Sequence, residues 1–380
     1  MKIIAAPDSY KNALRASAVA CAMARGWKQV RPQDEVVLLP MSDGGEGLCD
    51  ALCTALNGTK VGITVHDSLM RLREGIAVTA GDTAVVESAE ANGIELLDRS
   101  ELSPLKTTTY GVGELIKVLI EKYHCRNFIV GIGGSATVDG GIGMLQALGY
   151  RFYRRNGEII APGAGGGVLN EVYRMDDRDA RALLADVKIR VACDVTNILC
   201  GSSGSAAVFG PQKGASEEDV KVLDANLAHF ARIWNDPGCV PGDGAAGGLG
   251  FALRMLGATM VKGAQLVMEH TGFFSALAGA DLVLTGEGCS DDQTVCGKLC
   301  SEIARAAKEH NVPAVLISGA LRGDCRELEK LFAGCFSVST GVCTLDEALA
   351  ASEENIVRIT RNLAAFAGAF LSENKVKRNK

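Results

Sequence analysis

The stretch GIGGSATVDGG, residues 131–141, has five glycines in eleven positions and decides how the rest of the sequence is interpreted. It follows the apolar run NFIV at 127–130, which predicts a buried β-strand. Glycine is costly inside regular structure and useful where the backbone turns sharply or approaches a ligand closely. We therefore expect a loop at the end of a strand, with bare backbone turned toward a bound molecule.

Short apolar runs alternate with helical patterns along the whole chain. The expected strands are 2–6, 35–40, 127–133, 188–194, 280–286, 312–318 and 335–340, and the expected helices are 16–30, 111–123, 216–234, 297–310 and 344–371. This alternation, with nearly continuous apolar strands, predicts an α/β fold with a parallel sheet. The segment 63–90 looks different and suggests short paired strands, which would suit a second, mixed domain inserted into the first.

Composition excludes several classes of protein. The chain has 380 residues, is 47% hydrophobic and carries a net charge of −6, whereas a general nucleic-acid binder needs a basic face. No stretch approaches 18 apolar residues, so we expect no membrane span, and the start MKIIAAPDSYK does not resemble a signal peptide. The thirteen cysteines lack the spacing of a zinc site, which favours a cytoplasmic protein with reduced thiols.

Acidic residues follow five of the expected strands, where ligands of open α/β sheets bind. A single acid after a strand is commonplace, because Asp is a turn former and a helix cap. Acid and glycine together at five strand ends are harder to explain by turn formation and helix capping alone. The acids are Asp8, Asp43, Glu46, Asp139, Asp194, Glu287 and Asp291.

Phosphate with Mg²⁺ is the ligand that suits backbone amides, carboxylates and a few lysines. Backbone N–H groups at a helix N-terminus bind anionic oxygens, and Mg²⁺ takes one or two carboxylates together with phosphate. Lysine supplies a point charge for phosphate or for a substrate carboxylate. The candidate lysines are Lys11, Lys213 and Lys298.

A rival interpretation is a dinucleotide-dependent oxidoreductase, because GIGGSA matches G-x-G-x-x-A between a strand and a helical pattern. The acid expected about 20 residues further on is missing, since the sequence there is YRFYRRNG. The phosphate-binding loop of the common NTPases and the motifs of protein kinases are absent as well. A phosphotransferase of another type and an oxidoreductase both remain open at this point, as does a non-enzymatic sensor.

Seven motifs in order resemble the type I glycerate kinase family of bacteria, over almost the whole chain. They are APDSYKNAL (6–14), PMSDGGEG (40–47), GIGGSATVDGGIGMLQALG (131–149), VACDVTN (191–197), FGPQKGA (209–215), GDGAAGGLG (242–250) and TGEGCSDDQTVCGK (285–298).

The resemblance implies transfer of the ATP γ-phosphate to D-glycerate with Mg²⁺, giving 2-phosphoglycerate, with 3-phosphoglycerate as the alternative product. It implies a Rossmann-like lobe built from both chain ends, 1–62 and 280–380, and an inserted α/β lobe with a mixed sheet, 63–279. A monomer and a homo-oligomer both stay open.

Roles for the candidate residues combine this resemblance with the chemistry of phosphoryl transfer. We expect Asp194 to be the general base, with Asp291 as the alternative, and Lys11 or Lys298 to hold the glycerate carboxylate. Asp43 and Glu287 are the expected Mg²⁺ ligands. The expected substrate and nucleotide contacts are Asp8, Ser9, Asp43, Gly44, Gly45, Glu46, Gly133, Gly134, Ser135, Asp139, Lys213, Glu287 and Lys298.

The sequence departs from the family pattern at two places. Cys289 stands where the family usually has an arginine, so any contact made by that arginine needs another cation here. Ala13 stands where a serine is common after DSYK.

Overall fold

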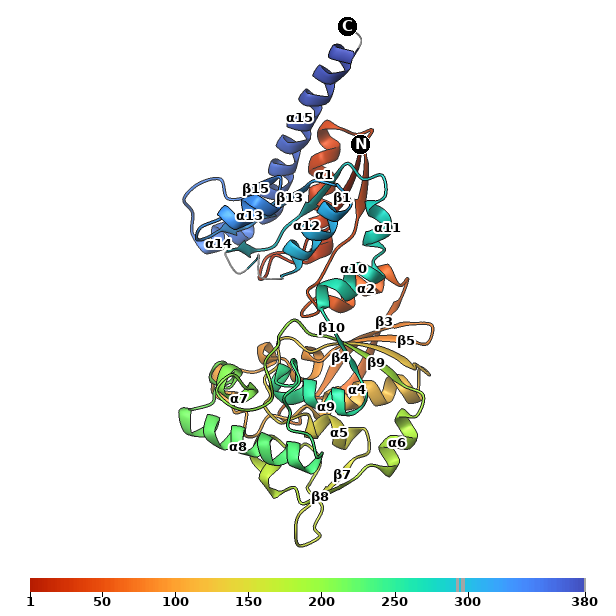
Figure 1. The fold of residues 1–380 in the computed structure, drawn as a ribbon, viewed down its shortest axis with the longest axis vertical. Coiled ribbons are helices and arrows are strands. Elements are labelled where there is room, and N and C mark those ends of the chain that lie inside the picture. The colour runs from red at the N-terminus through yellow and green to blue at the C-terminus, as the bar shows by residue number, and fades with distance from the viewer. Residues whose placement is uncertain (292–293, 295–297, 379–380) are drawn as a thin grey trace. The chain divides into compact units, whose positions relative to one another are not determined.

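The computed structural model describes residues 1–291, 294 and 298–378 and divides the chain into two compact units. The terminal unit consists of Met1–Asp43 and Ala264–Lys380, and the inserted unit of Gly44–Gly263 (Figure 1). The sequence analysis set these boundaries at 62/63 and 279/280. The chain enters the inserted unit earlier because α2 (Leu48–Ala55) packs against the strands of that unit's sheet. It leaves earlier as well, at 263/264.

The terminal unit is built on a parallel sheet of five strands, as expected. Its strand order is β15 (Gly334–Ser337), β13 (Ala314–Ser318), β11 (Leu282–Thr285), β1 (Lys2–Ala5) and β2 (Glu35–Leu38). All four pairings are parallel. The first and last thirds of the sequence thus share one sheet, and every expected strand of this unit is confirmed. A separate pair of short strands joins β12 (Cys289–Ser290) to β14 (Ala320–Leu321).

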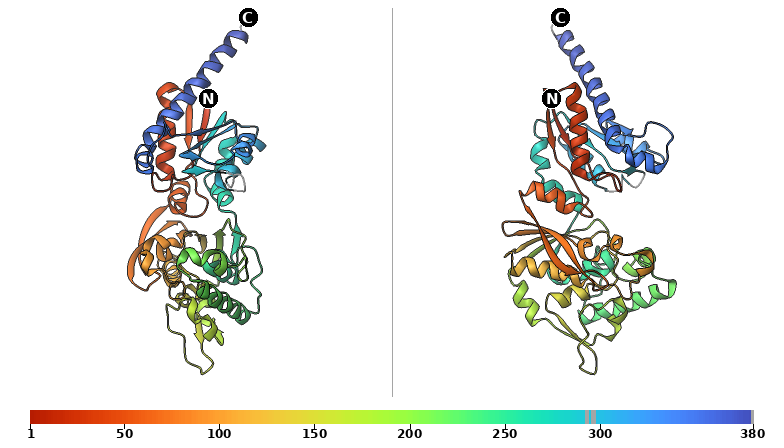
Figure 2. Two further views of the ribbon diagram at one scale, coloured as in Figure 1. Left: turned by 90° about the vertical axis from the view of Figure 1, so that its left-hand side faces the viewer. Right: turned by 180° about the vertical axis from the view of Figure 1, so that it is seen from behind.

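Helices α1 (Ala16–Val30) and α15 (Ser352–Arg378) run side by side in the terminal unit (Figures 1 and 2). The spacing of Val19, Met23, Trp27 and Val30 predicts one apolar stripe on this helix; the first three are fully buried, whereas Val30, at the end of the helix, is 40% exposed. Gly26 is required at the crossing, because a Cβ there would lie 2.1 Å from Thr360 Oγ1. Further helices of this unit are α11 (Phe273–Leu277), α12 (Leu299–Glu309), α13 (Arg326–Leu331) and α14 (Leu345–Ala350), and α10 (Gly263–His270) lies in it from its second residue on.

The single helix expected over 344–371 is two helices. Thr344 accepts from the Glu347 amide, and the Glu347 side chain accepts from the Thr344 amide, so α14 begins with a capping box. It ends at Ala350, and α15 begins two residues later. The break matters because α14 and the start of α15 line the cavity described below.

The inserted unit has a mixed sheet of six strands. Their order is β10 (Thr259–Val261), β9 (Lys188–Ala192), β6 (Asn127–Gly131), β5 (Thr83–Glu87), β4 (Leu72–Ala80) and β3 (Thr59–His66). Strands β5, β6, β9 and β10 are parallel, whereas β3, β4 and β5 form an antiparallel meander. The paired strands expected between 63 and 90 are this meander, and the expectation is confirmed.

Helices around this sheet bury one continuous apolar core, with Phe128, Phe152, Phe230 and Phe251 among its largest members. The helices are α3 (Ala89–Asn92), α4 (Tyr110–Glu121), α5 (Ile142–Ala147), α6 (Arg178–Leu184), α7 (Ser205–Phe209), α8 (Glu217–Ile233) and α9 (Leu249–Met255), and α10 (Gly263–His270) begins at the unit boundary. A hairpin joins β7 (Arg151–Tyr153) to β8 (Arg174–Asp176). The 111–123 and 216–234 helices expected from sequence are α4 and α8.

Two further observations bear on the expected class of protein. Among the described residues, no helix is both long enough and apolar enough to span a membrane. No disulfide bond joins any of the twelve cysteines in the described ranges, and the thirteenth, Cys296, lies outside them.

Candidate functional site

A cavity of about 540 Å³ lies in the terminal unit, beyond the carboxyl ends of its parallel strands. Its walls come from the loops that follow β1, β11 and β13 and from the segment 338–355. Six of the residues selected from sequence line it together, although they are far apart in the chain. They are Asp8, Ser9, Lys11, Asp43, Glu287 and Lys298. This is the edge of the sheet at which open α/β folds bind ligands.

Three carboxylates concentrate negative charge at one end of this cavity. Burial, together with the neighbouring charges of Asp43 and Glu287, raises the pKa of Asp8 to about 7, against the opposite influence of the Ser9 amide and Lys11. Burial likewise raises the pKa of Glu287 above its usual range. Carboxyl groups in this situation gain from a cation placed among them.

Hydroxyl groups that the sequence analysis missed hold Glu287 in position. Ser290 Oγ and Thr294 Oγ1 donate to Glu287 Oε1 over 2.8 and 2.9 Å. Ser290 Oγ also lies 2.6 Å from Ser318 Oγ at the end of β13. The Glu287 carboxylate is therefore fixed at one oxygen, and the strand-end hydroxyls that do this have no motif of their own in the sequence.

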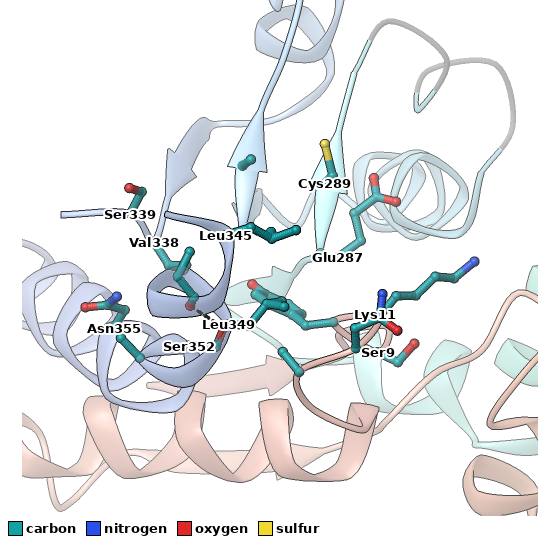
Figure 3. A pocket seen from close by; sticks show the side chains of 18 of the residues that line it. Ser9, Lys11, Glu287, Cys289, Val338, Ser339, Leu345, Leu349, Ser352 and Asn355 are labelled. Atoms are coloured by element: carbon teal, nitrogen blue, oxygen red, sulfur yellow. Dashed lines mark hydrogen bonds between the residues drawn. The ribbon is translucent and has the colours of Figure 1, made fainter. Parts of the chain in front are cut away.

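Two hydrogen bonds fix the loop that follows β1. The hydroxyl of Tyr10, which is buried, donates to the Ile317 carbonyl over 2.6 Å, and the Ser9 amide donates to Asp8 Oδ1 over 2.6 Å. Lys11 is exposed and lines the cavity beside Ser9 and Glu287 (Figure 3). The hydrogen-bonded loop thus presents the Lys11 side chain next to the carboxylates.

Lys298 and Asp291 lie at the margin of the same site. Lys298 Nζ is 3.5 Å from Asp291 Oδ1, and both side chains are substantially exposed, so the pair contributes little to stability. Cys289, which replaces the family arginine, also lines the cavity (Figure 3).

The carboxylates suit Mg²⁺ rather than a metal enclosed by protein alone. In the part of the chain that the structure describes, no group of three or more His, Cys, Asp or Glu side chains is placed to hold a metal ion. Mg²⁺ usually takes one or two carboxylates and completes its shell with water and phosphate oxygens. Two oxygen donors from Asp43 and Glu287, beside a cavity, fit that requirement.

A second group of selected residues lies at the carboxyl edge of the sheet in the inserted unit. The loop that begins at Gly44 packs against the ends of β6 and β9, and glycine is required where the backbones touch. A Cβ on Gly44 would lie 2.5 Å from the Ala192 Cβ, and one on Gly131 would lie 2.4 Å from the Gly44 carbonyl oxygen. A Cβ on Gly133 would lie 3.1 Å from the Gly45 Cα. The two glycine loops therefore meet, with Gly44, Gly45 and Glu46 in one and Gly133, Gly134 and Ser135 in the other.

Gly133 and Gly134 are exposed, whereas the residues that follow them are buried. Gly134 has φ +70°, a conformation that favours glycine. Lys213 lies beneath the loop, with Nζ donating to Ser135 Oγ and to the Thr137 carbonyl, both over 2.8 Å. Burial lowers the pKa of Lys213 to about 7, although Asp139 opposes this shift.

Asp139 is fully buried and accepts hydrogen bonds from its own surroundings. The Thr109 amide and hydroxyl donate to Oδ2 over 2.8 Å each, and the amides of Gly141 and Gly143 donate over 3.0 and 3.3 Å. Burial raises the pKa of Asp139 despite these bonds. Asp139 and Lys213 are thus both buried beneath the loop, and the contacts with substrate or nucleotide expected of them stay a prediction.

Asp194 lies two residues after the end of β9 and is exposed. Its Oδ1 accepts from the amide of Gly263, the first residue of α10, over 2.9 Å. One carboxylate oxygen is thereby oriented by the backbone.

Glu87, at the end of β5, is a residue that the sequence analysis overlooked. It accepts from the Cys49 amide over 2.7 Å and from the Gly47 amide over 3.3 Å, at the start of α2. Burial raises the pKa of Glu87 to about 7. The strand-then-acid pattern that drew attention to the other acids is present in TAVVE (83–87) and could have found it.

Comparisons with known proteins agree on one family. The model of the glycerate kinase family matches residues 3–368. The chain is 42% identical to the glycerate 2-kinase of Escherichia coli K12, with 96% of this chain and 97% of the relative covered, and 40% identical to a glycerate kinase of Bacillus cereus, with the same coverage. A crystal structure from Salmonella typhimurium LT2, named provisionally as glycerate kinase 2, is 40% identical and superposes with a TM-score of 0.87 over 98% of this chain and 99% of that one. The chain therefore belongs to the glycerate kinase family.

Proposed function

We propose that this glycerate kinase transfers the γ-phosphate of ATP to the 2-hydroxyl of D-glycerate, giving 2-phosphoglycerate and ADP. The observation that carries the proposal is the cluster of Asp8, Asp43 and Glu287 beside Lys11, in a cavity at the carboxyl edge of a parallel sheet. The choice of the 2-hydroxyl rests on the name of the Escherichia coli relative, glycerate 2-kinase. Neither the family nor the relatives favour the oxidoreductase suggested by GIGGSA.

Phosphoryl transfer depends on positioning and charge neutralisation more than on covalent chemistry. Asp43 and Glu287 would hold Mg²⁺, which when bound neutralises charge on the β- and γ-phosphate oxygens. Lys11 and Lys298 add positive charge for phosphate or for the glycerate carboxylate. The Ser290 and Thr294 hydroxyls keep Glu287 from turning away, so the anionic site is formed before substrate arrives.

The loop 131–141 supplies bare backbone to an anion in this proposal. Gly133 and Gly134 leave the exposed tip of the loop without side chains. The Ser135 hydroxyl oxygen accepts a hydrogen bond from Lys213, so the hydroxyl proton points away from the lysine. The opposing loop likewise has two residues without side chains, Gly44 and Gly45, before Glu46. We assign Asp194 as the general base that accepts the proton of the attacking hydroxyl, with Asp291 as the alternative.

One experiment tests the substrate, the activity and the position of transfer together. The purified protein is incubated with ATP, Mg²⁺ and D-glycerate, and the product is identified by ³¹P and ¹³C NMR. A proton-coupled ³¹P signal that is a doublet, from the single proton on C2, supports the proposal. A triplet, from the two protons on C3, replaces it by 3-phosphoglycerate formation, and an absence of any phosphorylated glycerate refutes it.

A further inference from the structure

The cavity of the terminal unit has an apolar end that phosphoryl transfer does not use. Val338, Leu345 and Leu349 line it, whereas Ser9, Lys11 and Glu287 line the opposite end (Figure 3). Asn355 and Ser339 lie beyond Val338, on the side away from Lys11 (Figure 3). The cavity therefore has carboxylates and a lysine at one end, and apolar side chains flanked by polar ones at the other.

The leucines of α14 are held out of the protein core. Leu345 and Leu349 are four residues apart and so share one face of the helix, and Leu345 is 71% exposed. None of the described residues of α14 is buried. The capping box nevertheless fixes the helix. Apolar side chains gathered at a cavity wall are typical of a site that a ligand covers.

Asn355 adds a polar group that can identify such a ligand. It lies one turn after Ser352 on α15, and its amide carries both donors and an acceptor. Within the described ranges, no hydrogen bond to another residue occupies its side chain. An asparagine amide matches the 6-amino group and N7 of adenine with two hydrogen bonds.

We propose that this end of the cavity binds the purine base of the phosphate donor, with Asn355 selecting a 6-amino purine. The inference rests on the proposed function, in which the donor is ATP. The base contacts Val338, Leu345 and Leu349, and the phosphates extend toward Lys11 and the carboxylates. D-glycerate does not fit this end, because it has no apolar surface with which to cover the leucines. A cavity of about 540 Å³ lies within the usual range of about 300–1,000 Å³ for ligands of nucleotide size.

Calorimetric titration with ADP and with inorganic tripolyphosphate separates the base from the phosphates. Leu345→Ser should weaken ADP binding about tenfold and leave tripolyphosphate binding unchanged, since only ADP has a base to cover. Leu72→Ser is the matched control, because Leu72 is 70% exposed and lies on β4 of the other unit. It should change neither titration. Equal weakening of both ligands by Leu345→Ser, or no weakening of either, overturns the proposal.

Asn355→Ala tests selection of the base. The wild-type protein should bind ADP at least tenfold more tightly than inosine diphosphate, and the variant should reduce that ratio to about twofold. A ratio unchanged by Asn355→Ala removes Asn355 from the site.

These titrations contain no glycerate, so they separate the two proposals. Base-dependent ADP binding without glycerate phosphorylation supports the nucleotide site and refutes the kinase reaction. Phosphorylation of glycerate with a KM for ATP that Leu345→Ser leaves unchanged supports the kinase reaction and refutes the proposed site for the base.

Discussion

Lys213 Nζ donates to Ser135 Oγ over 2.8 Å, and both side chains are buried in the inserted unit. A second hydrogen bond of the same length joins Lys213 to the Thr137 carbonyl. One lysine thus holds the segment that directly follows the exposed glycines. A buried amine of this kind is a support for the loop above it, and its removal leaves two acceptors without their donor.

Lys213→Met should lower kcat/KM for glycerate by about ten- to a hundredfold in a folded protein. The methionine keeps most of the buried stem but donates no hydrogen bond, so the loop 131–141 loses its fixed position. Steady-state kinetics and circular dichroism measure the two quantities. Lys221→Met is the control, because Lys221 lies on the surface of α8, and a Lys213→Met enzyme as active as this control would contradict the supporting role.

The free energy of unfolding should depend on pH through Lys213. Its pKa is lowered to about 7 in the folded protein and returns to about 10.5 on unfolding. Between these values the unfolded chain binds a proton that the folded protein has released, so stability rises with pH, by at most about 1.4 kcal/mol per pH unit. Lys213→Met lacks this contribution. In urea unfolding, the free energy of unfolding of the wild type should therefore rise relative to that of the variant between pH 7 and pH 9.5. A difference in this free energy that is the same at both pH values would show that Lys213 does not titrate in this range.

Gly134→Val should abolish turnover and leave a folded protein. Valine is strained at φ +70° and places a branched side chain where the loop is bare. Gly157→Val is the matched control, since Gly157 has φ +90° with open space around it. It carries the same kind of strain but should keep full activity. Retained turnover in Gly134→Val would reduce the loop to a structural turn.

Lys11→Met should raise KM for glycerate or lower kcat by at least tenfold, which corresponds to roughly 1.4 kcal/mol of lost binding or transition-state stabilisation. Lys11 is exposed at the cavity wall, so the change should leave the melting temperature as it is. Initial rates over a glycerate series at saturating ATP test this. Kinetics equal to those of the wild type would remove Lys11 from the site.

Asp194→Asn should lower kcat by about 10² to 10⁴ and preserve the fold and ATP–Mg²⁺ binding, because a general base contributes in that range. Asparagine keeps an oxygen to accept from the Gly263 amide, so the local backbone should not move. The same measurements on Asp291→Asn complete the comparison. If Asp194→Asn loses nucleotide binding but keeps kcat at saturation, the role of base passes to Asp291.

Most strands of both sheets could be predicted from sequence, because they are short apolar runs, whereas the short strand β10 was not predicted. The cavity carboxylates could be found in the same way, since each follows such a run. The two helices around Ala351 were merged in the prediction, although the TLDE sequence at 344–347 contains the capping box that separates them.

The roles of Asp139 and Lys213 could not be predicted, for a physical reason. Their residue types and glycine-rich surroundings are those of ligand-binding groups, and only the packing of distant segments decides that both are buried. Lys213 reaches a loop 76 residues earlier in the chain. Ser290, Thr294 and Ser318 escaped notice for a related reason, since a hydroxyl acquires its role from the partner that folding brings to it.

The close crossing at Gly26 has a consequence for how the chain is made. Strand β1 and helix α1 leave the ribosome well before their partners β11 and α15, which begin only at residues 282 and 352. During synthesis the apolar side chains of Val19, Met23 and Trp27 therefore stay uncovered until α15 has been made. The inserted unit, by contrast, has all its strands by residue 261. The middle of the protein can thus mature first, and the ends close last, so release of a prematurely terminated chain would leave its oldest segment as the exposed and aggregation-prone one.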